Sequence, residues 1–108
     1  MANTFKSAAT GSTTTLTTLY TCPASTTSVV HAIYMSNIDG INDATIDIAI
    51  SDSANFQTRR YILKTVDIPA DSTVVIEKPI NLGDGDKLET KASANGDIDV
   101  FASILEIS

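Results

Sequence analysis

The spacing of turn residues restricts the possible folds of this chain most strongly. Gly, Asn, Asp and Pro recur at intervals of about ten residues, and the runs between them are rich in Thr, Ile and Val. β-branched side chains favour strands over helices, and no stretch repeats apolar residues with the period of an amphipathic helix. The pattern predicts an all-β chain, folded as an antiparallel β-sandwich of about seven or eight strands with jelly-roll or immunoglobulin-like connections.

The length of 108 residues suits a single domain preceded by a short arm. Residues 1–12 are mostly small or polar, with Phe5 as their one aromatic residue. They predict an N-terminal arm that is either loose or laid on a neighbouring molecule. Residues 13–108 are expected to form the sandwich. Because residues 1–15 lack an apolar core segment, no secretory signal is expected there.

Residues 28–37 (SVVHAIYMSN) predict a strand with apolar side chains on both faces. Alternation is expected to place Val29 and Ile33 together on one side. A strand of this kind lies in the middle of a sheet or in an interface. Residues 45–51 (TIDIAIS) alternate Ile with other residues, which predicts a half-buried strand whose Asp47 faces water.

Residues 97–107 (DIDVFASILEI) form the longest apolar run and are also expected in the middle of a sheet or under a partner molecule. Alternation puts Phe101 and Leu105 on the face opposite the core-facing side chains. These two residues therefore exceed what one small core needs. Asn95-Gly96, directly before the run, is a strong β-hairpin signal.

Composition excludes several classes of function. Seven Lys and Arg oppose thirteen Asp and Glu, a formal net charge of −6, so neither nucleic acid nor an anionic membrane surface is an expected partner. No apolar run approaches the roughly 20 residues of a membrane-spanning helix. The single His31 and the single Cys22 have no nucleophile motif and no set of metal ligands around them in the sequence. We therefore expect no catalytic residues, no cofactor and no enzymatic activity.

The acidic loop at residues 37–43 is the best candidate for a metal site. Asn37, Asp39, Asn42 and Asp43 offer oxygen ligands of the kind that Ca²⁺ prefers. Their spacing departs from the twelve-residue calcium loop that ends in Glu. Asn and Asp are also favoured in turns, where their side chains bond to the nearby backbone. The sequence favours a polar hairpin turn over a calcium site.

Two adjacent arginines, Arg59 and Arg60, follow a polar loop. Successive strand residues point to opposite faces, so a joint clamp on one phosphate is disfavoured. We expect these arginines to form ion pairs with an acidic patch on an identical neighbour. Together with Phe5, Phe101 and Leu105, they make up the predicted assembly interface.

The order of several short motifs resembles a known family. The chain has TLYTCPA at residues 18–24, a Val- and Ile-rich strand ending at Asn37, IPA at residues 68–70 and INLGDGDKL at residues 80–88. This order is similar to that of a family of small β-sandwich virion structural proteins of tailed bacteriophages, including marine and cyanobacterial phages. In that family, a LYT-x-PA segment, a V/I-rich strand ending in Asn, an IPA turn and a GD-x-I/L turn recur. Cys22 departs from the apolar residue expected at its position.

The resemblance implies a component of the virion that is present in the host cytoplasm during assembly. We expect a capsid decoration, or cement, subunit that binds to itself, with a trimer as the favoured state, and to a phage capsid or tail protein. A neck, tail, baseplate or fibre-root subunit is one alternative. A carbohydrate-binding module for host attachment is another, motivated by the acidic loops, although a chain without Trp has few aromatic residues to stack on a sugar.

Overall fold

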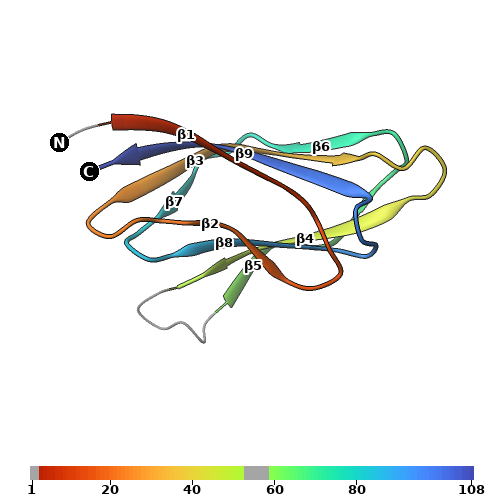
Figure 1. Ribbon diagram of the computed structural model, residues 1–108, viewed down its shortest axis with the longest axis horizontal. Helices are drawn as coiled ribbons and strands as arrows, with labels where there is room; N and C mark the ends of the chain where they lie inside the picture. The colour runs from red at the N-terminus through yellow and green to blue at the C-terminus, as the bar shows by residue number, and fades with distance from the viewer. Residues whose placement is uncertain (1–2, 53–58) are drawn as a thin grey trace.

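The computed structural model describes residues 3–52 and 59–108, which contain nine β-strands and no helix that could cross a membrane. The strands are β1 (Asn3–Gly11), β2 (Thr17–Thr21), β3 (Thr27–Asn37), β4 (Ala44–Ser51), β5 (Arg59–Ile68), β6 (Thr73–Ile76), β7 (Ile80–Leu82), β8 (Lys87–Ala92) and β9 (Ile98–Ile107). They form two antiparallel sheets that pack face to face, so the predicted β-sandwich is confirmed (Figure 1). The molecule is elongated, with extents of 47 × 28 × 19 Å.

The strand order identifies the sandwich as a jelly roll. Sheet A has the order β1-β9-β3-β6, with β7 also paired to β3, and sheet B has the order β2-β8-β4-β5. The pairs are nested along the chain: β1 with β9, β2 with β8, β3 with β6 and β7, and β4 with β5. Successive nested pairs alternate between the two sheets, which is the jelly-roll arrangement.

Strands β6 and β7 share one edge position of sheet A. β6 pairs with residues 33–36 of β3, and β7 pairs with residues 28–30 of the same strand. Pro79 lies between them and has no N–H group with which to continue the ladder. The described strands therefore slightly exceed the predicted seven or eight, because one strand position is interrupted.

Most consecutive strands cross from one sheet to the other, so two predicted hairpins are wrong. The Asn95-Gly96 turn does form, and Gly96 has a positive φ of 75°, which glycine adopts readily. However, β8 before this turn lies in sheet B and β9 after it lies in sheet A. The loop at residues 37–43 likewise joins β3 of sheet A to β4 of sheet B. Turn chemistry is local, whereas long-range pairing decides which sheet a strand joins.

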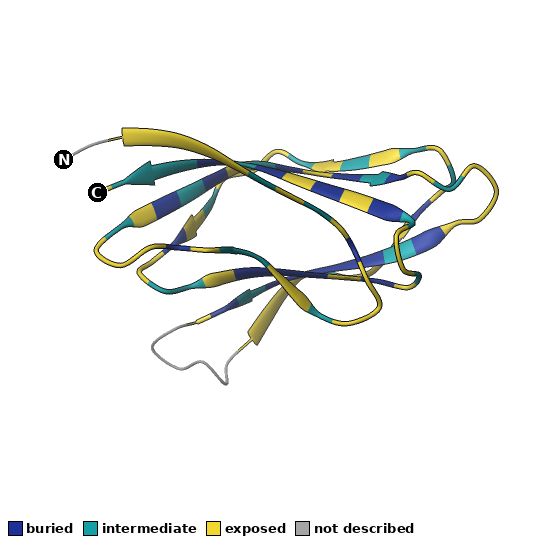
Figure 2. Cartoon of the chain, in the orientation of Figure 1, coloured by how far each residue is buried: buried dark blue, intermediate teal, exposed yellow. Residues whose placement is uncertain are grey.

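The segment expected to be an N-terminal arm is instead a strand of the sandwich. Residues Asn3–Gly11 pair with β9 along their whole length, from Asn3 opposite Ile107 to Gly11 opposite Asp99. Ser12 continues the attachment, because its N–H donates to the carbonyl of Ile98. The side chains of β1 are mostly exposed (Figure 2). The backbone ladder therefore holds this strand, and composition alone gives no sign of it.

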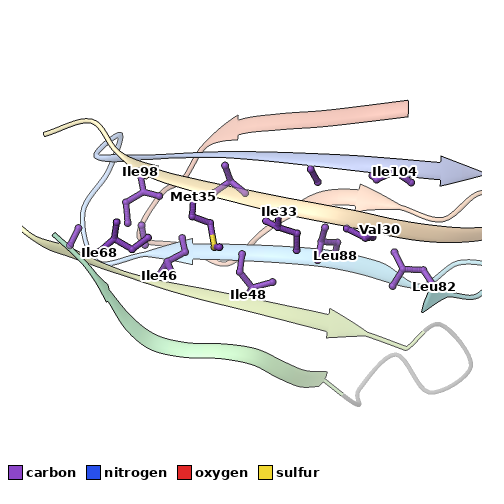
Figure 3. Packing of buried hydrophobic residues seen from close by; sticks show 14 of the residues in the cluster. Val30, Ile33, Met35, Ile46, Ile48, Ile68, Leu82, Leu88, Ile98 and Ile104 are labelled. Atoms are coloured by element: carbon purple, nitrogen blue, oxygen red, sulfur yellow. The ribbon is translucent and has the colours of Figure 1, made fainter. Parts of the chain in front are cut away.

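One apolar core fills the space between the sheets (Figure 3). Its largest fully buried side chains come from both layers and include Ile33, Met35, Ile46, Ile48, Ile68, Leu82, Leu88, Ile98 and Ile104. The prediction that residues 97–107 lie in the middle of a sheet is confirmed, because β9 pairs with β1 on one side and β3 on the other.

A β-bulge in β3 reverses the face predicted for Val29. Val30 pairs with Ile104 of β9 and Ala32 pairs with Ser103, so His31 is an additional residue in this strand. As a result Val30, and not Val29, shares the core with Ile33. A one-residue shift of this kind moves the side chains on one side of the bulge to the opposite face.

Asp47 of β4 is buried, although the alternation of its strand predicts that it faces water. β4 lies between β8 and β5 in sheet B, so its neighbours can cover its outer face. The Asp47 carboxylate accepts a hydrogen bond from the N–H of Thr65 at 2.7 Å and forms an ion pair with Lys64 at 3.3 Å. These two partners compensate the carboxylate for the loss of water.

Candidate functional site

The outer face of sheet A gathers apolar side chains in two rows. One row consists of the cross-strand partners Phe5 of β1, Leu105 of β9 and Val29 of β3. The other row consists of Ala9 of β1, Phe101 of β9, Tyr34 of β3 and Val75 of β6. A middle row of Ser7, Ser103 and Ala32 separates them. We call these three rows, with His31 beside the middle row, the sheet A face.

Large aromatic side chains of the sheet A face are open to solvent. Phe5 is 77% exposed, and Tyr34 and Phe101 are 43% and 44% exposed. The Phe5 and His31 rings lie 6.4 Å apart, and the Tyr34 and Phe101 rings lie 6.3 Å apart, which are typical distances for contacting aromatic pairs. Exposed apolar side chains gathered on one sheet face in this way are typical of interaction sites.

A pocket of about 450 Å³ opens at one end of the sheet A face. Ala9, Thr10 and Gly11 of β1 line one side, and Tyr34 and Phe101 are among the residues that line the rest. Because Ala9 and Gly11 have little or no side chain, β1 leaves a depression beside the two aromatic rings. The pocket is therefore bounded by small residues and by aromatic rings.

Formal charge is nearly absent from the sheet A face. Among the described strand residues that point outward from sheet A, only Asp99 at the pocket end carries a formal charge. Lys6 and Glu106 alternate with the outward residues of their strands, so they lie on the core side of the sheet. Depletion of charge together with aromatic residues is typical of the centre of a protein–protein interface.

The predicted assembly residues Phe5, Phe101 and Leu105 lie together on the sheet A face, and Phe5 is directly opposite Leu105. The sequence does not single out Ala9 or Val75, because they lie in strands with few other outward apolar residues. They are identified only by the pairing of Ala9 with Phe101 and of Val75 with Tyr34, and this pairing cannot be derived from the sequence alone.

The other two predicted assembly residues, Arg59 and Arg60, lie in β5 at the edge of sheet B. The Arg59 guanidinium binds the Glu89 carboxylate through two N–H groups, at 2.8 and 3.2 Å, and this carboxylate raises the pKa of Arg59. The intervening residues of β4, Ala49 and Ser51, are small enough for the two long side chains to meet. Arg59 therefore forms within its own chain the ion pair that was expected with a neighbour. Arg60 is exposed.

The predicted calcium ligand Asn37 is buried and holds the 37–43 loop in place. Its Nδ2 donates to the carbonyls of Asn42 at 3.0 Å and Ile68 at 2.9 Å. Its Oδ1 accepts a hydrogen bond from the N–H of Asp39 at 2.9 Å. Both Nδ2 hydrogens and the Oδ1 atom of Asn37 are thus bonded to backbone groups.

The two predicted acidic ligands are engaged in the same way. Asp39 accepts hydrogen bonds from the N–H groups of Ile41 and Asn42, and these bonds, that of Ile41 first, hold its pKa below the ordinary value of 3.8. Asp43 accepts a hydrogen bond from the N–H of Ala70 at 3.0 Å. Among residues 3–52 and 59–108, no three His, Cys, Asp or Glu side chains form a group that could hold a metal ion. Calcium binding at this loop stays an untested alternative to the turn.

Tyr20 of β2 connects the two sheets near the C-terminal end of β9. Its hydroxyl bonds to Ser28 at 2.8 Å and donates to the Glu106 carboxylate at 2.5 Å. Burial, followed by the bond to Glu106, raises the pKa of Tyr20 to about 12. The neighbouring Cys22 is buried and accepts a hydrogen bond from Ser28, as suits a small core residue.

Comparison with known proteins finds a similar fold but no family to which the chain can be assigned. No protein-family model matches the chain, and no curated protein matches its sequence. In fold, the chain is similar to a chain in the crystal structure of the T13 IBDV viral particle, with a TM-score of 0.61 and 9% sequence identity. The similarity covers 96% of this chain and 30% of the viral chain, so this chain spans less than a third of that protein's length. The sandwich described here is thus a fold that also occurs in a viral particle.

Proposed function

We propose that this protein is a structural subunit of a virus particle. The sheet A face carries the proposal, because it is a broad apolar surface, almost without charge, on a rigid two-sheet body. Jelly rolls recur in viral capsid domains, and a chain of the IBDV particle has a similar fold. Binding to a repetitive shell requires a rigid body and an exposed contact surface, and this chain offers both.

The specific role that we propose is decoration of the capsid of a tailed bacteriophage. The motif order shared with small phage virion proteins supports this role. In it, the protein binds to copies of itself and to a capsid protein, acts in the virion after assembly in the host cytoplasm, and catalyses no reaction. A neck, tail, baseplate or fibre-root position would use the same surface at a lower copy number. The carbohydrate-binding alternative has less support, because the Asp39 and Asp43 carboxylates accept hydrogen bonds from the backbone N–H groups of Ile41 and Ala70.

Quantitative mass spectrometry of purified virions tests this function. A copy number comparable to that of the major capsid protein supports decoration. A copy number smaller by one or two orders of magnitude supports a neck or tail position instead. Absence of the protein from washed particles refutes the proposal that it is a virion component.

A further inference from the structure

We propose that two copies of this chain associate through their sheet A faces, with Phe5 of each copy inserted into the pocket beside Ala9 of the other. The result is a symmetric dimer in which sheet A of one copy packs on sheet A of the second. This inference deepens the self-association named in the proposed function: it assigns the sheet A face to the contact between copies and leaves the capsid contact to another surface of the dimer. Its test uses the purified protein alone.

The rows of the sheet A face make the face complementary to itself. The middle row of Ser7 and Ser103 lies between the Phe5 row and the Ala9 row. A two-fold axis that lies in the interface and crosses the strands at this middle row exchanges the two apolar rows. It places Phe5 of one copy over Ala9 of the other, and Leu105 over Phe101. At Phe5 a large side chain then meets a small one, whereas Leu105 and Phe101 meet as two large apolar side chains. The same patch of both copies forms the contact, as in an isologous two-fold interface.

The pocket provides the space that Phe5 needs. Its volume of about 450 Å³ lies within the range of roughly 300–1,000 Å³ that is usual for pockets that hold small molecules, so a phenyl ring fits. Tyr34 and Phe101 line it, so the inserted ring gains aromatic neighbours. In the single chain Phe5 remains 77% exposed, and insertion would remove most of that apolar surface from water.

The area of the sheet A face is sufficient for a stable dimer. Four strand positions spaced by about 4.8 Å, with about nine residues rising about 3.3 Å each, give a face of roughly 600 Å². Two such faces bury about 1,200 Å² in total, which reaches the lower end of the range for specific interfaces.

The charge distribution permits an identical partner at this face. The chain has a net charge of −6, so two copies repel each other in most orientations. Among the described outward strand residues of sheet A, Asp99 alone is formally charged, and it lies at the end of the face, so the centre can meet its own copy without like charges in contact. The two-fold complementarity gives a dimer, in place of the trimer expected from the sequence.

Light scattering coupled to size exclusion, over a series of protein concentrations, tests the proposal. The wild type should reach twice its 11.4 kDa mass. Phe5→Ala should raise the dissociation constant on the order of a hundredfold, because each dimer contains the contact twice and truncation of an aromatic residue seated in a pocket costs about tenfold or more. Ala9→Trp, which fills the pocket, should have a similar effect. Ile41→Ala is the matched control, because Ile41 is 86% exposed in the loop between β3 and β4 and lies off the face.

A charge exchange tests the position of the two-fold axis. Ser103→Lys and Ser103→Asp each place like charges beside the axis, so each variant alone should be monomeric, and an equimolar mixture should recover the dimer mass. A wild type that stays monomeric, a trimer, or a dimer that survives either Phe5→Ala or Ala9→Trp overturns the proposal. None of these results changes the copy number in virions, so failure of the dimer and failure of the proposed function are distinguishable.

Discussion

Substitution of Asn37 by Ala tests whether the 37–43 loop is held by its own hydrogen bonds. The Asn37 side chain makes three of them, to the carbonyls of Asn42 and Ile68 and from the N–H of Asp39. Each contributes about 1 kcal/mol net, and a buried carbonyl that loses its donor adds a desolvation penalty of about 1 kcal/mol or more. We therefore expect Asn37→Ala to lower the free energy of unfolding by about 4 kcal/mol. A domain of ordinary stability, about 5–15 kcal/mol, stays folded after such a loss.

Urea unfolding followed by far-UV circular dichroism measures this loss. Asn42→Ala is the matched control, because Asn42 is exposed and its side chain makes one hydrogen bond, to the Asp39 carboxylate at 3.2 Å. An exposed contact of this kind contributes little, so the control should stay within about 0.5 kcal/mol of the wild type.

Calcium separates the turn interpretation from the metal-site hypothesis for the same loop. If the loop is held by its own bonds, neither calcium nor a chelator changes the melting temperature of the wild type. Asn37→Asp should then be at least as destabilising as Asn37→Ala, because a carboxylate would face the carbonyl oxygens of Asn42 and Ile68. A loss below about 1 kcal/mol in Asn37→Ala, or a melting temperature that rises with calcium, would refute the reasoning.

Three further substitutions test other parts of the structure. The pKa of the Tyr20 hydroxyl is about 12 in the folded chain and 10.0 in the unfolded chain. The free energy of unfolding should therefore fall as the pH rises above about 10, and urea titrations should show a smaller fall for Tyr20→Phe. Arg59→Ala should lower the melting temperature more than Arg60→Ala, because Arg59 pairs with a carboxylate of its own chain, and a change of solution mass in either variant would instead indicate an intermolecular pair. Gly96→Ala should lower the free energy of unfolding by about 1 kcal/mol, because alanine is strained at the positive φ of this position. No atom lies within 4 Å of the added carbon, so no steric clash contributes. An unchanged unfolding midpoint would contradict this expectation.

Strand alternation predicted the regular strands well and failed where a strand is irregular. In residues 97–107 the period of two separates the core-facing side chains from Phe101 and Leu105 correctly, because β9 has no bulge against β1. In residues 28–37 the same rule fails for Val29, because His31 is an additional residue in the strand. Nothing in the local sequence marks that bulge, which lies beside the break between β6 and β7 in the neighbouring edge strand.

Long-range pairing accounts for the remaining differences. Residues 3–11 have the composition of an arm, and they form a strand only because β9, at the far end of the chain, provides a ladder for them. Arg59 finds its carboxylate partner thirty residues away in the sequence, across the small side chains of Ala49 and Ser51 in β4. Phe5 is exposed because of the register of β1 and not because it lies in a loose arm, and its role as a contact residue stays a prediction.

The nested pairing of the strands also fixes the order in which the chain can fold during its synthesis. β9 follows every other described strand and lies between β1 and β3 in sheet A. Until β9 leaves the ribosome, β1 has no ladder partner and β3 lacks one of its neighbours. β4 and β5, by contrast, are close in sequence and can pair early. The nascent chain therefore exposes unpaired strand edges for most of translation and is most prone to aggregate just before β9 is made.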